Sequence, residues 1–152
     1  MKARKAHYGD VAQMVKVCRR LHEKSSWNAL KFNPVHVKKN LVEMIRTDGM
    51  DPLIVVDDEG DIRGVLLATL DQFFMSKQWY ATDAHFMCEA GGIQLLAEFK
   101  RWAKAHGAGL IIMGIANDDP GNRVHRFYEM AGLYPVGDAW VIDLKDSEEK
   151  AA

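Results

Sequence analysis

Three small residues, Ala90, Gly91 and Gly92, stand immediately before a run of apolar residues at helical spacing. A helix beginning there would present unpaired backbone N–H groups, and the positive end of its dipole, to an anion such as a pyrophosphate. Glycine also allows the close backbone approach that such a ligand needs. No Gly-Lys-Ser/Thr sequence follows, so the segment is not a nucleotide-binding P-loop. The alternative is that the two glycines only turn the chain from a strand into a helix.

Two titratable side chains, Asp83 and His85, lie within a predicted strand at 79–87. Because alternate residues of a strand point to the same face, we expect these two side chains on one face of the sheet. Carboxylates and imidazoles are common general bases, so both residues are candidates for removing a proton. The alternatives are that Asp83 is a charge at a sheet edge or bonds a loop, and that His85 is a packed aromatic ring.

The residues that could ligate a metal show no recognisable spacing. The six histidines form no H-E-x-x-H or comparable pattern, and Cys18 and Cys88 lie far apart outside any C-x-x-C sequence. We therefore predict neither a metal site nor a disulfide framework, which suits a reducing compartment. No apolar run follows the basic start and none approaches the ~20 residues that span a bilayer, so we expect a cytoplasmic protein without a membrane partner.

Length and composition are those of one ordinary globular domain. The chain has 152 residues, of which 48% are hydrophobic and 27% charged. We assign the domain to residues 1–146 and expect the polar tail at 147–152 to be frayed. The formal net charge of −1 supplies no overall attraction to nucleic acid, so nucleic-acid binding is not expected.

The elements that must position these residues can be read from periodicity and capping signals. Asp10, paired with Gln13, and Asn33, followed by Pro34, are expected to cap two helices, and Asn122 a third. Gly64 is expected at a bulge or a close approach. The expected order is strand 3–7, helices from 11 and 34, strands 53–56, 62–74 and 79–87, helix 92–106, buried central strand 110–115, helix 123–131, and strands 133–136 and 139–144. This order predicts an α/β protein with a mixed sheet and helices on both faces.

Two segments in that order resemble the GCN5-related N-acetyltransferase (GNAT) family. Arg126-Phe-Tyr-Glu-Met-Ala-Gly-Leu133 is similar to the family's "F/L-Y-x-x-x-G-F" segment, with leucine in place of the last phenylalanine. Residues 92–107 are similar to the helix that follows the family's acyl-CoA pyrophosphate loop. The resemblance spans about residues 3–144. It implies a GNAT-like fold in which strands 79–87 and 110–115 are adjacent and splayed, with the pantetheine of CoA between them.

The resemblance also implies roles for individual residues. Tyr128 matches the tyrosine that protonates the leaving CoA thiolate, the alternative being a half-buried structural tyrosine. Asp83 falls where many relatives carry a carboxylate, so Asp83, or else His85, would take a proton from an acceptor amine, whose ordinary pKa is ~10.4. The candidate residues for binding the acyl-CoA are Phe86, Met87, Ala90, Gly91, Gly92, Ile93, Asn122 and Arg123.

The pyrophosphate loop departs from the family pattern Q/R-x-x-G-x-G/A. Met87 replaces the basic or amide residue and Ala90 replaces the first glycine. Two functions follow. The first is an acyl-CoA-dependent N-acyltransferase that moves an acetyl group from acetyl-CoA, its co-substrate, to a primary amine by direct attack in a ternary complex. The second is a non-catalytic GNAT-fold binding or structural protein. The retained Tyr128 favours the first and the altered loop favours the second, and a homodimer is left open.

Overall fold

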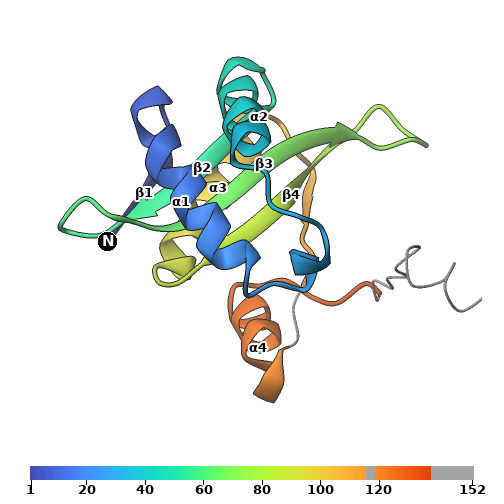
Figure 1. Ribbon diagram of the computed structural model, residues 1–152. Coiled ribbons are helices and arrows are strands. Elements are labelled where there is room, and N and C mark those ends of the chain that lie inside the picture. Colours follow the sequence, from blue (N-terminus) through green and yellow to red (C-terminus); the bar gives the residue numbers. More distant parts are fainter. Residues whose placement is uncertain (116–118, 138–152) are drawn as a thin grey trace, which may run out of the picture.

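A five-stranded sheet forms the centre of the computed structural model, which describes residues 1–115 and 119–137 (Figure 1). The strands lie in sequence order, the first four antiparallel and the last parallel to its neighbour: β1 (Lys2–Lys5), β2 (Met50–Val56), β3 (Ile62–Gln72), β4 (Trp79–Cys88) and β5 (Leu110–Ile112). The parallel pair confirms the predicted crossover, because a strand that returns through a helix runs parallel to the first. The mixed α/β sheet is therefore as expected.

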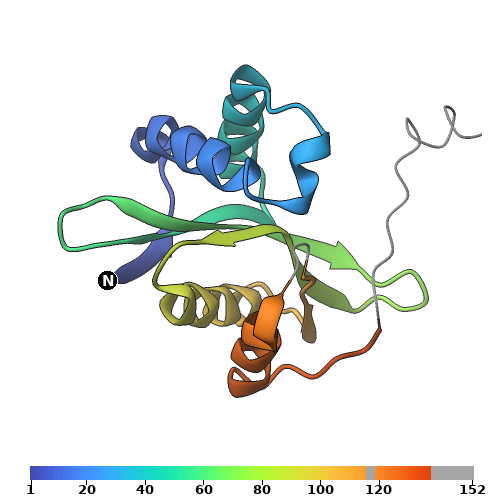
Figure 2. The same ribbon diagram turned by 60° about the horizontal axis from the view of Figure 1, so that its bottom comes forward.

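Helices cover both faces of this sheet (Figure 2), as predicted. Helices α1 (Val11–His22) and α2 (Pro34–Arg46) pack on one face, and α3 (Gly92–Ala105) and α4 (Arg123–Met130) lie on the other. Three single 3₁₀ turns complete the described elements: η1 (Tyr8–Asp10), η2 (Ser26–Ala29) and η3 (Pro120–Asn122). None of the described helices has the length and apolar character needed to cross a membrane.

The strand alternation divides the core into two layers. Ile54 and Val65 point toward α1 and α2, whereas Leu53 and Leu66 point toward α3, where they meet Phe99. All five side chains are fully buried, and each aliphatic one contributes roughly 1.5–3 kcal/mol through removal from water. The sheet is thereby fixed between two helical layers, and its strand ends can carry polar groups.

The predicted role of Asp10 as the cap of α1 is wrong. Its carboxylate accepts two hydrogen bonds from the Arg4 guanidinium, at 2.7 and 2.9 Å, and one from the His7 backbone N–H at 2.9 Å. Gln13 donates instead to Asp61, at 3.1 Å. A charged guanidinium binds a carboxylate more strongly than a neutral backbone N–H does, so Arg4 takes Asp10 from the helix.

The other two predicted caps have opposite outcomes. Asn33 caps α2 as predicted, because its side-chain oxygen accepts the backbone N–H of His36 at 3.0 Å and Pro34 begins the helix. Asn122 precedes α4 but makes no side-chain capping bond, so that prediction is wrong. The carboxylate of Asp119 accepts the first backbone N–H groups of α4 instead.

Gly64 lies at both of the features predicted for it. A Cβ built on it would lie 2.7 Å from the sulfur of Cys88 and 3.1 Å from Val55 Cγ1, so β4 and β2 approach it closely. The register between β2 and β3 also shifts beside this residue, which marks a bulge.

The last part of the predicted sheet differs from expectation. A buried strand at 110–115 is wrong, because among the described residues β5 pairs with Tyr80–Thr82 of β4 alone, and its Leu110 and Ile112 side chains are 58% and 44% exposed. A strand with a partner on one side only is covered less than a central one. Residues 133–137, as described, contain no strand, so the strand predicted at 133–136 is also wrong. The strand predicted at 139–144 and the tail at 147–152 lie outside the described residues.

Candidate functional site

Strand β4 contains a β-bulge at Ala84, where its register with β3 shifts by one residue. Ala81 and Phe86 both pack toward α3 although they are five positions apart, an odd spacing that strict alternation would not allow. Asp83 follows Ala81 at a spacing of two and lies on that same side. His85 lies on the other side, so the predicted shared face of Asp83 and His85 is wrong. The bulge between the two residues interrupts the alternation.

A buried tyrosine from α4 meets the chain segment after β5. Tyr128 is 9% exposed, and its hydroxyl donates a hydrogen bond to the backbone carbonyl of Gly114 at 3.0 Å. The pairing of β4 with β5 ends at Thr82 and Ile112, whereas β4 itself continues to Cys88. Asp83 is the first residue of β4 beyond that pairing, and Gly114 follows β5 at the same level. The expected adjacency of the two strands is confirmed, and they part where Asp83, Gly114 and Tyr128 gather.

The electrostatics of this group suit proton transfer. Asp83 Oδ1 is buried and has no hydrogen-bond partner in the described chain. Desolvation raises the pKa of Asp83 to about 6. Hydrogen bonding by the backbone N–H groups of Asp83 and Gly114 lowers this pKa but has a smaller effect. Burial, and secondarily the Asp83 charge, raise the pKa of Tyr128. At neutral pH an ionised carboxylate with an unused acceptor therefore lies near a phenol that keeps its proton.

His85 belongs to a different environment, on the α1 face. Its ring makes an edge contact with Trp27, with the ring centroids 6.1 Å apart. The pKa of His85 is lowered, first by partial desolvation and then by His22. The imidazole can accept a proton, but the sheet lies between it and Tyr128. The structure therefore brings Asp83, and not His85, to the tyrosine.

The turn that leads from β4 into α3 requires glycine at Gly91. Its φ is +78°, and a Cβ on it would lie 2.7 Å from Val55 Cγ2. Any other residue would combine an unfavourable backbone conformation with a collision against the core. Gly91 therefore turns the chain from strand to helix, which was the alternative interpretation of the glycines. Any binding of an anion would fall to the neighbouring backbone amides.

The first amides of α3 are oriented as an anion site would need. Leu95 donates the first intrahelical hydrogen bond, to the Gly91 carbonyl at 3.0 Å, so the N–H groups of Gly92 and Ile93 precede the helix ladder. The Ile93 side chain is 67% exposed and does not cover them. Ala90 differs, because its N–H makes a long bond of 3.4 Å to a β3 carbonyl. Gly92 and Ile93 therefore have the better amides for a phosphate.

Of the remaining predicted cofactor residues, Phe86 lies near this helix start, whereas Met87 lies on the other face of the sheet. The Phe86 ring is 6.3 Å from that of Phe127 in α4, and a Cβ on Gly92 would meet Phe127 at 3.5 Å. Arg123 is exposed one turn before Phe127, on the same side of α4. Two other predicted residues complete the set: Asn122, in the left-handed conformation at the start of α4, and Met87, on the face of β4 opposite Phe86.

Asp119 is a structural residue of the site that sequence reasoning missed. Its carboxylate accepts the backbone N–H groups of Val124 and His125 at 2.9–3.0 Å and lies 2.6 Å from His125 Nδ1. Desolvation alone would raise the pKa of Asp119, but these hydrogen bonds lower it to about 2. The missed signal is an aspartate directly before Pro120, the usual order of a cap and a first helical residue. Asp119 fixes the start of the helix that carries Tyr128.

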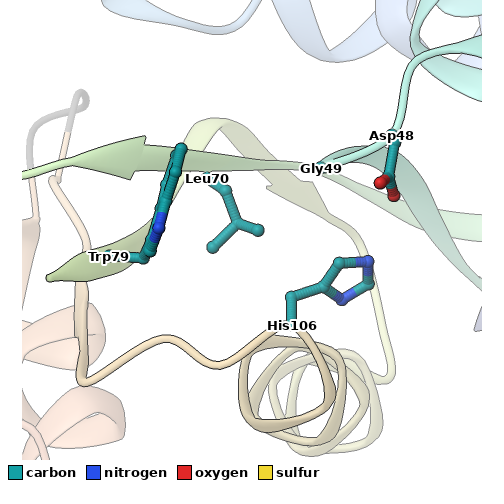
Figure 3. Close-up of a pocket in the computed structure, with 5 residues that line it drawn as sticks. All are labelled: Asp48, Gly49, Leu70, Trp79 and His106. Carbon is teal, nitrogen blue, oxygen red and sulfur yellow. The ribbon is translucent and has the colours of Figure 1, made fainter. Parts of the chain in front are cut away.

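Two cavities open on the described surface away from these residues. The first, of about 270 Å³, lies between the turn before β2, the start of β4 and the end of α3; Leu70 forms its floor, with Trp79 on one side and His106 and Asp48 on the other (Figure 3). The second, of about 550 Å³, lies beside α1 and the start of β3. Neither has Asp83 or Tyr128 in its described lining. No cluster of three or more His, Cys, Asp or Glu side chains suited to a metal occurs in residues 1–115 and 119–137.

Comparison with known proteins gives the fold. No family model and no curated protein matches the sequence significantly. Among solved structures, a putative acetyltransferase from Agrobacterium tumefaciens is 15% identical, with a TM-score of 0.73 over 94% of this chain and 99% of that one. A GNAT family acetyltransferase from Staphylococcus aureus is 16% identical, with a TM-score of 0.67 over 93% of this chain and 97% of that one. The chain has the fold of the GNAT acetyltransferases.

The GNAT fold is shared by proteins with different descriptions. A transcriptional regulator from Bacillus halodurans is 21% identical to this chain, with a TM-score of 0.76 over 94% of this chain and 99% of that one. A common fold therefore does not by itself determine the reaction, which must be argued from the site. In this chain the GNAT fold places Asp83 and Tyr128 at the separation of β4 and β5.

Proposed function

We propose that the protein is an acyl-CoA-dependent N-acetyltransferase that moves an acetyl group from acetyl-CoA to a primary amine of a small molecule or protein. One observation carries the proposal: the buried Oδ1 of Asp83, which has no hydrogen-bond partner among the described residues, lies near Tyr128, where β4 and β5 separate. A general base and a hydroxyl proton donor, placed where two strands separate, are the two groups that aminolysis of a thioester can use. We also propose a cytoplasmic location, since both cysteines are free.

Acetyl-CoA would lie along the separation of β4 and β5. Its pyrophosphate would accept hydrogen bonds from the Gly92 and Ile93 amides at the start of α3. Arg123, exposed on the side of α4 that faces this helix start, would add a positive charge. The pantetheine would pass the beginning of the gap and bring the thioester toward Asp83 and Tyr128.

The reaction is a direct transfer in a ternary complex. The amine nitrogen attacks the thioester carbonyl carbon, a C–N bond forms, and the C–S bond breaks with its electron pair going to sulfur. Asp83 accepts the proton that leaves the amine, and its pKa of about 6 is close to the value that suits a base at neutral pH. Tyr128 turns its hydroxyl from the Gly114 carbonyl toward sulfur and protonates the thiolate. Since the raised pKa of Tyr128 disfavours a tyrosinate, the proton held by Asp83 restores the phenol.

Substitution of Tyr128 tests this proposal. Tyr128→Phe is expected to lower kcat by roughly one to three orders of magnitude at nearly constant KM for acetyl-CoA, as for a group that acts mainly in the transition state. Loss of the bond to the Gly114 carbonyl should also cost about 1 kcal/mol of stability. Release of CoA thiol is followed with a panel of amines. The matched control is Tyr134→Phe, whose hydroxyl lies on a 79% exposed side chain. Full activity in Tyr128→Phe would remove this residue from the mechanism.

A non-catalytic GNAT-fold protein is the second candidate function. The observation that favours it is the loop before α3, in which Glu89 places a carboxylate beside the proposed pyrophosphate site and the Ala90 amide is already bonded. Calorimetry with acetyl-CoA separates the two candidates. Absence of binding at millimolar acetyl-CoA would reject the acetyltransferase and leave the binding or structural protein.

A further inference from the structure

The cavity of about 550 Å³ lies between α1, the start of β3 and the loop before α3. The start of β3 faces the end of β4, where Gly64 pairs with Cys88. The cavity is thus on the opposite side of β4 from β5, and it is separate from the gap that holds Asp83 and Tyr128. Its lining is mainly charged and polar: Gln13, Lys16, Val17, Arg20, Asp61, Ile62, Arg63 and Glu89.

Three cations line this cavity. Arg20 binds the Glu89 carboxylate with two hydrogen bonds, Nε to Oε1 at 2.6 Å and Nη2 to Oε2 at 3.2 Å. Arg63 Nε is buried without a hydrogen-bond partner among the described residues, and its distance to Glu89 Oε2 is 3.8 Å. Lys16 is exposed and forms no ion pair within the described part of the chain. One carboxylate therefore lies between two guanidinium groups and leaves donors unused.

The other acidic side chains nearby are engaged by the turn between β2 and β3. Asp57 Oδ1 accepts the Asp61 backbone N–H at 2.8 Å, and Asp57 Oδ2 lies 3.6 Å from Arg63 Nη1. Asp61 Oδ1 accepts a hydrogen bond from Gln13 at 3.1 Å. Within the described residues, neither carboxylate forms an ion pair with Lys16 or Arg20. Among the described residues, Glu89 is the acid that binds Arg20, and Arg63 lies near both Glu89 and Asp57.

We propose that this cavity binds a phosphate group, and that Glu89 occupies the position of the anion when no phosphate is present. A phosphate has more acceptor oxygens than a carboxylate and nearly twice its charge. It can accept the Arg20 fork, the unused Arg63 Nε–H and the Lys16 ammonium together. Displacement of Glu89 would also release the link between α1 and the loop before α3. The phosphate comes either from a free phosphate ion or from a phosphate of acyl-CoA.

Calorimetric titration of the protein with inorganic phosphate tests the site without any acyl-CoA. Lys16→Met and Arg20→Met each remove one charged donor and keep the aliphatic stem, so each should weaken phosphate binding by about tenfold or more. Glu89→Gln removes the competing charge and should tighten binding by up to roughly fivefold, the range for an exposed ion pair. The matched control is Lys38→Met, an exposed lysine of α2 on the same face of the sheet, which should leave the affinity unchanged.

Several results would overturn the proposal. These are no heat of binding at millimolar phosphate, equal weakening by Lys16→Met and Lys38→Met, or weaker binding in Glu89→Gln. Thermal melts confirm that each variant is folded, and Lys16→Met leaves the Glu89 pair intact. Titration with CoA then identifies the source: Lys16→Met weakens CoA binding only if a CoA phosphate occupies the cavity. Either source supports the site, and a protein that binds phosphate but no CoA would reject only the proposed acetyltransferase.

Discussion

Removing the charge of Asp83 should stabilise the protein while it abolishes the proposed base. Desolvation raises the pKa of this carboxyl from 3.8 to about 6. A shift of about two pKa units corresponds to roughly 3 kcal/mol, and access of water to a half-buried group reduces the expected value to about 1–3 kcal/mol. Asp83→Asn is nearly isosteric and removes this cost. A domain of this size gains about 2–4 °C in Tm for each kcal/mol.

The sign of the pH dependence distinguishes this cause from others. Because the folded pKa lies above the unfolded one, the folded state holds more protons than the unfolded state between about pH 4 and pH 6. The free energy of unfolding contributed by Asp83 therefore falls as pH rises through that window, and the full cost is present above about pH 6. The gain in Asp83→Asn should be largest at neutral pH and nearly vanish near pH 4.

Differential scanning calorimetry of wild type and Asp83→Asn at both pH values measures the effect. Asp71→Asn, which removes an exposed carboxylate from β3, is the matched control and should leave the pH dependence of Tm unchanged. The reasoning fails if Asp83→Asn is no more stable than wild type at neutral pH. It also fails if the gain is the same at every pH.

Three further outcomes are expected. The logarithm of kcat/KM should rise with unit slope against pH up to about pH 6 and then level off. A profile with no inflection near pH 6 would exclude Asp83 as the base. Acetyl-CoA at one hundred times its Kd should add about 2.7 kcal/mol of stability, measured as a rise in Tm in a thermal melt. Gly92→Val should abolish this rise, whereas Gly92→Ala should retain it because its Cβ would make ordinary contacts at 3.5–3.9 Å. Gly91→Ala should lower Tm even without ligand, since its Cβ would lie 2.7 Å from Val55; an unchanged Tm would contradict the strained turn.

The fold could be predicted where local patterns agree with tertiary packing. The hairpin signals, the Asn33–Pro34 helix start and the strand–helix–strand crossover all correspond to described elements. The exceptions depend on tertiary contacts that local periodicity does not encode. Asp10 binds Arg4 across the turn after β1, and the apolar run at 110–115 is exposed because it pairs on one side only within the described part of the chain. Neither partner can be identified from the spacing of nearby residues.

The site was predictable in its residue types and not in their geometry. The structure places Tyr128 near Asp83, whereas strand periodicity put His85 on the same face as Asp83 and the bulge at Ala84 separates those two. Alanine carries no signal for a bulge, so the sequence could not show it. The sequence also gives no signal for contacts made by backbone groups, such as the Gly114 carbonyl that accepts the hydrogen bond of the Tyr128 hydroxyl.

The single extra residue at Ala84 also decides how β4 responds to changes in chain length. Asp83 and His85 pair with Ala68 and Leu67, which are adjacent in β3, so deleting Ala84 would leave a regular ladder in which every later side chain keeps its face. Phe86 would stay in the layer under α3, and His85 would stay on the opposite face. An insertion at the exposed tip of the β3–β4 hairpin, beside Phe74, would shift no register and should be tolerated. An insertion at the hairpin tip and a deletion of Ala84 should therefore both preserve the two core layers.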